Sequence, residues 1–414
     1  MNFEAPHGLP WRGRGWAAPF VWLFARSDPM TCFLKALLSA VVLAMALPVA
    51  AQSPQAPAIA ARSYLLLDLT ASQVLAEKEV DSTVEPGSLT KLMVAYLVFD
   101  ALKAGRVDLK QRMAVSERAW KMPGSRMFID PKMSVPVEDL IKGMVVQSGN
   151  DATVALAEGV GGSVERFVEL MNAQAEALGM KSTRYKNPEG TAEPGHASTA
   201  RDLGVLAGRL IQDFPEFMAF YALKQYRYEA SPSTNSGNRN LLLFRDPTVD
   251  GLSTGYTNAT GYALVATAKR DFPNVGGRRL LSIVLGAASE NARANESQKL
   301  LNWGYTAYEA VKLFDAGQAV VVPGVWKGRD NTARLGRPEA IVVAVPAGQA
   351  SRLQTQVTRP EPVVAPLQKG QAVGMLKISL GERPLLEVPL LALDGVEQAG
   401  VMGRAWDALR LWIK

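Results

Sequence analysis

The sequence predicts an α/β (α+β) domain with an antiparallel sheet flanked by helices, followed by a small all-β domain and a C-terminal amphipathic helix. Three observations support this prediction. Strand-like segments lie at both ends of a helical region within residues 62–315. Residues 316–395 contain short β-branched segments separated by Gly and Pro. Residues 396–414 place apolar and basic side chains on opposite helical faces. Strands on both sides of a run of helices are typical of one layered domain.

The elements of the first region follow in order along the chain. Residues 64–69 and 74–78 flank Thr70-Ala71-Ser72 and predict a β-hairpin. Residues 88–104 are apolar on nearly every helical face, which indicates a buried helix. We expect further helices and then strands at the following segments: helices at 136–146, 151–160, 164–178 and 200–211, strands at 262–268 and 279–285 after residues 249–261, to which no element is assigned, and a helix at 292–309.

The two C-terminal regions have different patterns. In residues 316–395 we expect strands at 320–322, 340–345, 354–357, 372–379 and 385–388. In residues 396–414, one helical face carries these apolar side chains: Val401, Met402, Ala405, Leu409, Trp412 and Ile413. Such a helix either lies in a membrane interface or docks on its own protein. The two Trp residues near the end of the chain favour membrane anchoring.

The N-terminus predicts export. Residues 36–48 are an apolar run after Lys35, and Val49-Ala50-Ala51 suits signal peptidase. We therefore interpret residues 1–51 as a signal peptide with an over-long N-terminus, Met30 being the true start, and residues 52–61 as a Pro/Ala linker. The alternative is an uncleaved anchor with a short cytoplasmic tail. The single cysteine, Cys32, lies in the removed part, which fits an oxidising compartment such as the periplasm.

Composition excludes several functions. The 414 residues are 48% hydrophobic, so the chain is not disordered. One Cys and two His argue against a disulfide scaffold and a metal cage. A net charge of +6, spread along the chain, does not indicate nucleic-acid binding. We expect no metal and no cofactor.

Three short motifs carry the chemistry. The first is Ser88-Leu89-Thr90-Lys91, where i and i+3 spacing lets a hydroxyl meet an amine. A serine needs a base to act as a nucleophile, and burial can lower a lysine pKa enough to provide one. The spacing alone is common in chains of this length.

The other two motifs are weak in isolation. Ser148-Gly149-Asn150 offers a hydroxyl for proton relay and an amide for a peptide backbone, but it also suits a turn with Asn150 capping a helix. Ser253-Thr254-Gly255 precedes a strand, and a glycine at a strand edge permits close approach of a substrate backbone.

In this order, the motifs resemble those of the serine penicillin-recognising enzymes, S-x-x-K, S-x-N and K-T-G. The flanking residues resemble the D-alanyl-D-alanine carboxypeptidases, which are low-molecular-mass penicillin-binding proteins. They include Pro86-Gly87 before Ser88, Asp151-Ala152 after Asn150, and Ser198-Thr199-Ala200-Arg201-Asp202. The resemblance runs from about Arg62 to the C-terminus and implies a β-lactamase/transpeptidase-like catalytic domain.

The resemblance implies a role for each matched residue. Ser88 would attack the carbonyl between two terminal D-alanines of a peptidoglycan stem peptide, and Lys91 would take its proton. Ser148 would protonate the leaving amine, and Asn150 would position the substrate amide. The backbone N–H groups of Ser88 and Tyr256 would form an oxyanion hole. Thr254 and Arg293 would hold the terminal carboxylate, beside Gly255. β-Lactams would acylate Ser88 as mimics, on the periplasmic face of the inner membrane.

One position departs from the family pattern. Ser253 stands where the third motif has a lysine, so a positive charge facing the substrate is missing. We therefore expect a working but weakened carboxypeptidase. The alternatives are a catalytically impaired penicillin- or peptidoglycan-binding structural protein and a related serine β-lactamase. No role is assigned to His196, which we expect to be a surface or capping residue.

Overall fold

The predicted hairpin is present as β1 (Ser63–Asp68) and β2 (Gln73–Lys78), paired antiparallel. The structure is a computed structural model that describes residues 54–229 and 233–413, which belong to one unit. The predicted signal peptide and alternative start at Met30 lie outside the described residues. Residues 54–61, interpreted as a linker, contact α9 (Glu290–Ala307): the Ala60 amide donates to Glu296 Oε2 at 3.0 Å.

The hairpin belongs to a five-stranded antiparallel sheet with the order β2-β1-β7-β6-β5. The three later strands are β5 (Val249–Thr257), β6 (Gly261–Phe272) and β7 (Gly276–Ala287). The predicted sheet built from both ends of the domain is therefore confirmed. Strand β5 lies at one edge, where an extended peptide can be added as a further strand.

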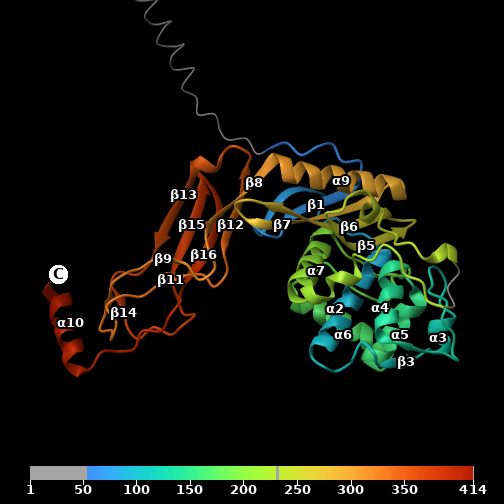
Figure 1. Cartoon of the computed structure of the whole chain (residues 1–414), viewed down its shortest axis with the longest axis horizontal. Helices are drawn as coiled ribbons and strands as arrows, with labels where there is room; N and C mark the ends of the chain where they lie inside the picture. The colour runs from blue at the N-terminus through green and yellow to red at the C-terminus, as the bar shows by residue number, and fades with distance from the viewer. Residues whose placement is uncertain (1–53, 230–232, 414) are drawn as a thin grey trace, which may run out of the picture. The chain divides into compact units, whose positions relative to one another are not determined.

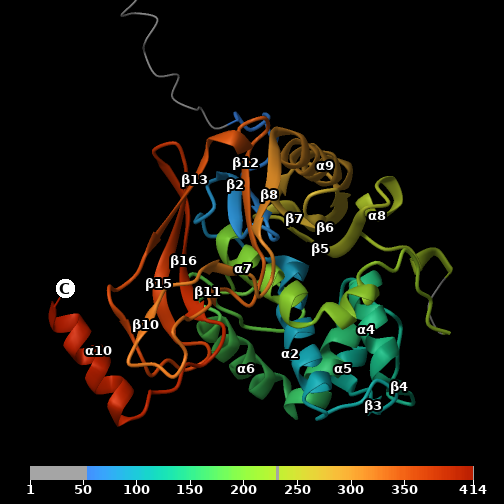
Figure 2. The ribbon, with the colours of Figure 1, turned by 60° about the vertical axis from the view of Figure 1, so that its left-hand side comes forward.

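Helices cover both faces of this sheet (Figure 1). Helix α9 packs on one face through a cluster that includes Leu66, Leu264 and Leu300. The other face packs against helices through Leu65, Val265 and the buried side chains of α2. Figure 2 shows α2 in the middle of this helical layer. The helices and short turns of the layer and its connections are α2 (Lys91–Lys103), α3 (Glu117–Trp120), α4 (Val137–Val146), α5 (Asn150–Gly161), α6 (Val164–Ala177), α7 (Ala200–Asp213), η2 (Pro215–Phe220), η3 (Ser233–Asn235) and α8 (Leu242–Arg245), with a small hairpin of β3 (Arg112–Ala114) and β4 (Ser134–Pro136).

Two predicted helices have different bounds in the structure. The helix predicted at 88–104 is a 3-10 turn, η1 (Gly87–Thr90), followed by α2, so Ser88 lies in the tighter turn. The helix predicted at 292–309 ends at Ala307, and Tyr308 starts strand β8 (Tyr308–Phe314). Strand β8 pairs with β12 (Ile341–Pro346), which lies beyond residue 315 in the chain.

The C-terminal region is β-rich, as the sequence predicts. A five-stranded sheet has the order β13-β15-β16-β11-β9 and shares a core with β12 through Val343, Leu376 and Leu390. The remaining elements of the region are β9 (Ala319–Val321), β10 (Val325–Trp326), β11 (Leu335–Gly336), η4 (Ala350–Arg352), β13 (Leu353–Thr358), β14 (Val363–Val364), β15 (Ala372–Leu380) and β16 (Arg383–Ala392).

The last helix, α10 (Val401–Ile413), begins later than the predicted residue 396. Val396 is buried and exchanges two backbone hydrogen bonds with Leu367, so it belongs to the β-rich region. Asp407 Oδ2 accepts a hydrogen bond from the Lys327 amide at 2.6 Å. Within the described residues, no helix has the length and apolar character needed to cross a bilayer.

Candidate active site

The three motifs meet at one cleft. Its lining includes Ser88 of η1, Ser148 and Asn150 at the start of α5, Thr254 to Tyr256 of edge strand β5, and Arg293 of α9. The cavity has a volume of about 640 Å³. That size falls in the range of small-molecule sites. Eight of the nine predicted site residues therefore lie in or directly behind one cavity, and Ser253 is the exception.

Lys91 lies behind Ser88 and is 4% exposed. Its Nζ donates to Ser88 Oγ at 3.0 Å, to Asn150 Oδ1 at 2.8 Å and to the main-chain oxygen of Glu189 at 2.8 Å. All three acceptors are neutral. Burial lowers the pKa of Lys91 to about 7, although the charges of Glu189 and Asp151 act in the opposite direction. An amine with this pKa can accept the proton of the adjacent serine at neutral pH.

Asn150 of the S-x-N motif is held by side-chain hydrogen bonds and does not cap a helix. It is the first residue of α5; its side-chain Nδ2 donates to the Pro123 oxygen at 2.7 Å, and its Oδ1 accepts from Lys91. Gly149 occupies the N-cap position of α5 and has no side chain to accept a capping hydrogen bond. Ser148 has a φ of 58°, an uncommon conformation for a residue other than glycine. The next residue, Asp151, is fully buried and accepts from the amides of Met127 and Phe128.

Strand β5 passes close to η1, the turn that carries Ser88. A Cβ on Gly255 would lie 2.9 Å from the Pro86 oxygen, so a side chain at this position would push the strand and the turn apart. The sequence predicts that this glycine permits close approach of a substrate backbone. The structure adds that the glycine is needed for close packing of the protein's own backbone.

Arg293 is 4% exposed and is held by main-chain oxygens. It donates to the Gly255 oxygen at 3.1 Å and to the Arg239 oxygen at 3.3 Å. Arg239 itself lines the cleft, so two arginines border the cavity near β5. Sequence reasoning missed Arg239 because no motif marks it.

Ser253 lies on the face of β5 that carries the helical layer. Its cross-strand partner is Val265, which belongs to the core packed on α2. Directly opposed residues share a face of the sheet. A lysine at this position would therefore extend toward the side where Lys91 lies, whereas Thr254, opposite Leu264, belongs to the other face.

The expectation for His196 is wrong. The ring is 3% exposed, with Nε2 2.9 Å from Thr90 Oγ1 and Nδ1 accepting from the Lys186 amide at 3.3 Å. Because Nδ1 accepts, Nε2 carries the proton and donates to Thr90. Burial lowers the pKa of His196 to about 4, so the ring is neutral near pH 7. A single histidine in a loop sequence does not indicate that its ring packs behind η1, the turn that carries Ser88.

Comparisons with known proteins identify the family of this chain. A family model described as D-alanyl-D-alanine carboxypeptidase matches residues 50–289, and one for the penicillin-binding protein 5 C-terminal domain matches residues 308–398. D-alanyl-D-alanine carboxypeptidase DacC of Escherichia coli (strain K12) is 40% identical over 86% of this chain and 90% of its own length.

Solved structures are also similar. The crystal structure of penicillin-binding protein 5 from Haemophilus influenzae has a TM-score of 0.78 and 34% identity, over 83% of this chain and 99% of that chain. Penicillin-binding protein D2 from Listeria monocytogenes, solved in the ampicillin-bound form, has a TM-score of 0.53 and 28% identity, over 60% of this chain and 98% of that chain. Since the first family model covers more than half of the sequence, the chain belongs to the D-alanyl-D-alanine carboxypeptidase family.

Proposed function

We propose that this carboxypeptidase removes the terminal D-alanine from peptidoglycan stem peptides through an acyl-enzyme on Ser88. The observation that carries the proposal is the environment of Lys91. Its Nζ lies 3.0 Å from Ser88 Oγ, and its pKa is lowered to about 7 by burial. The amine is therefore able to take the serine proton during attack on the carbonyl carbon.

The substrate would bind along the free edge of β5. An extended peptide that is antiparallel to this strand has its C-terminal end toward Thr254 and its N-terminal part toward Thr257. Arg239 and Arg293 then supply positive charge for the terminal carboxylate. The backbone N–H groups of Ser88 and Tyr256 stabilise the oxyanion.

The remaining steps use the other two motif residues. Ser148 passes a proton to the departing D-alanine amine, and Asn150 orients both Lys91 and the substrate amide. A β-lactam enters the same cleft and acylates Ser88. The ampicillin-bound relative supports this part of the proposal.

Two measurements on one purified sample test this function. We expect covalent labelling by a fluorescent penicillin and release of D-alanine from a D-Ala-D-Ala peptide, both abolished in Ser88→Ala. Labelling without D-alanine release would instead identify an impaired, penicillin-binding structural protein. Labelling that persists in Ser88→Ala would overturn the role of Ser88.

We further propose that the enzyme is exported to the periplasm and held at the inner membrane by α10. The helix exposes large apolar side chains: Val401, Met402, Trp406, Leu409 and Trp412. It is attached to the β-rich region through a polar residue, Asp407, which leaves those side chains available to a bilayer. We expect the protein to float with anionic phospholipid vesicles, and a Trp406→Ser, Trp412→Ser variant to remain in the soluble fraction. Equal flotation of the two proteins would contradict this anchor.

A further inference from the structure

One carboxylate in the cleft has no role in the acylation step described above. Glu189 lies on the loop between α6 and α7, is 7% exposed, and lines the cavity with Ser88 and Asn150. A glutamate is seldom so buried unless it is paired. Among the described residues, no cation forms an ion pair with it, so its burial needs another explanation.

The loop around Glu189 is held rigidly. Asn187 Oδ1 accepts from the amides of Gly190 at 2.8 Å and Thr191 at 3.0 Å, and Asn187 Nδ2 donates to the Thr191 oxygen at 3.0 Å. Gly190 has a φ of 85°, and a Cβ there would lie 1.9 Å from the Gly87 oxygen. Only glycine can be accommodated at this distance, so the loop lies in direct contact with the turn that carries Ser88.

One carboxylate oxygen of Glu189 is held by a hydrogen bond, and the other is available to accept one. Thr191 Oγ1 donates to Oε1 at 2.8 Å, whereas Oε2 has no hydrogen-bond partner within residues 54–229 and 233–413. The main-chain oxygen of the same residue accepts from Lys91. The negative charge of Glu189 also acts on Lys91, whose pKa it raises. The carboxylate is therefore close to the reacting groups and has an unused acceptor.

Hydrolysis of an acyl-enzyme needs such an acceptor. Water must lose a proton as its oxygen attacks the acyl carbon, and a carboxylate within reach can take that proton. The proton taken from Ser88 has by then moved through Lys91 and Ser148 to the leaving amine, so the activation of water is a second, separate proton transfer.

We propose that Glu189 is the general base that activates the deacylating water. Water adds to the ester carbon and gives one proton to the carboxylate. The bond from that carbon to Ser88 Oγ then breaks, and the proton passes from Glu189 to the departing serine oxygen. The products are free serine and a carboxylic acid, so atoms and charges balance. This inference rests on the acyl-enzyme on Ser88 proposed above.

The experiment separates acylation from deacylation in the full chain. With a fluorescent penicillin, stopped-flow labelling gives the acylation rate, and loss of label after removal of free reagent gives the deacylation rate. In Glu189→Gln we expect acylation within about threefold of the unsubstituted protein, and deacylation slower by about 10²-fold or more, as for loss of a general base. Intact mass should show the acyl-enzyme persisting, which also demonstrates that the variant is folded.

Glu85→Gln is the matched control, because it removes a second carboxylate from the cleft lining whose side chain makes no contact with Lys91 among the described residues. We expect this variant to deacylate at the unsubstituted rate. Unchanged deacylation in Glu189→Gln, or an equal fall in both rates, would overturn the role of Glu189 while leaving the Ser88 mechanism intact. Absence of labelling in the unsubstituted protein would overturn both.

Discussion

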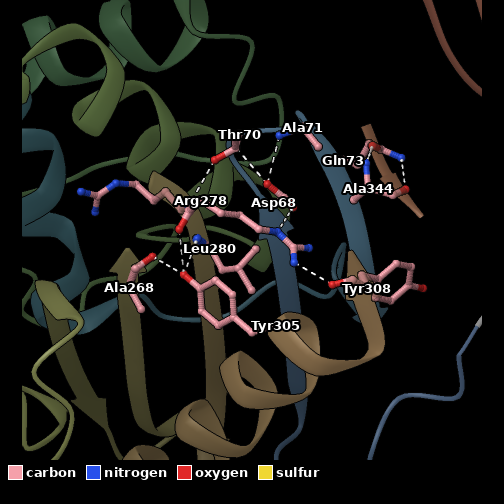
Figure 3. A network of polar contacts seen from close by, with 11 residues as sticks. Asp68, Thr70, Ala71, Gln73, Ala268, Arg278, Leu280, Tyr305, Tyr308 and Ala344 are labelled. Atoms are coloured by element: carbon pink, nitrogen blue, oxygen red, sulfur yellow. Dashed lines mark hydrogen bonds and ion pairs between the residues drawn. The ribbon is translucent and has the colours of Figure 1, made fainter. Parts of the chain in front are cut away.

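Two buried cations in the same domain have opposite surroundings. Arg278 on β7 is fully buried and donates to Asp68 Oδ2 at 2.8 Å and to the Tyr308 oxygen at 2.7 Å (Figure 3). The aromatic ring of Tyr305 lies 5.7 Å from its guanidinium. Asp68 is also fully buried and accepts from the amides of Thr70 and Ala71. The carboxylate of Asp68 thus balances the positive charge of Arg278 inside the domain.

Within the described part of the chain, Lys91 has no such counter-charge in contact. Its three acceptors are neutral oxygens, and its pKa is lowered to about 7 by burial. Arginine keeps its proton in proteins, whereas lysine loses it readily when buried. We infer from this difference that an arginine with a carboxylate partner maintains a structural charge, whereas a lysine among neutral acceptors is suited to act as a base.

Removal of the Lys91 amine should have the largest effect on activity. In Lys91→Met, the acylation rate by penicillin should fall by about 10³-fold or more, because loss of a catalytic group acting with the nucleophile is rarely compensated. Stopped-flow acylation measures this effect, and circular dichroism verifies the fold. A fall of less than tenfold would mean that Lys91 is not the base of the acylation step.

Asp68→Asn tests the structural role of the buried Arg278. It leaves Arg278 charged and buried without a carboxylate, which should lower the free energy of unfolding by about 3–5 kcal/mol. The matched control is Asp81→Asn, which breaks an exposed ion pair with Arg201 and should change stability little. Urea unfolding compares the two variants. Equal stabilities would show that the buried pair contributes no more than a surface pair.

Ser253→Lys restores the missing charge and should raise kcat/KM for D-alanine release by about fivefold, because a charged hydrogen bond contributes roughly 1 kcal/mol more than a neutral one. Ser253→Met has similar length without charge and should give no gain. If both variants behave alike, or if the lysine variant gains nothing, the serine does not weaken this enzyme.

Much of the fold and site could be predicted because each depends on local patterns. The family, the fold class and the carboxypeptidase activity inferred from the three motifs are confirmed. The all-round apolar character of residues 88–104 predicted the burial that lowers the pKa of Lys91. Spacing within a motif is local, so it is visible in one sequence.

The remainder depends on contacts between distant segments. His196 packs behind Thr90, and Glu189 contacts Lys91, across separations of 106 and 98 residues. Neither residue lies in a recognisable pattern. The sequence likewise predicts the first two residues of strand β8 as the end of a helix, because the strand's partner β12 follows only after residue 340. The role of a polar loop residue becomes visible only when the fold places its loop against the site.

The pH dependence of acylation should show the smallest and most discriminating effect. Only neutral Lys91 accepts a proton, so the rate should rise with pH and level off above about 7, where the amine is deprotonated.

Ser253→Lys adds a positive charge on the face of β5 toward Lys91, which disfavours the protonated amine, so the rising part of the pH profile should move to lower pH. Glu189→Gln should move it in the same direction, because it removes a negative charge that raises the pKa of Lys91. Penicillin acylation rates measured in steps between about pH 5.5 and 8.5 bracket the transition, and each shift should stay near or below about one pH unit. A rate independent of pH across this range would mean that the amine does not titrate there, and the contrast with Arg278 would then rest on side-chain identity rather than on surroundings.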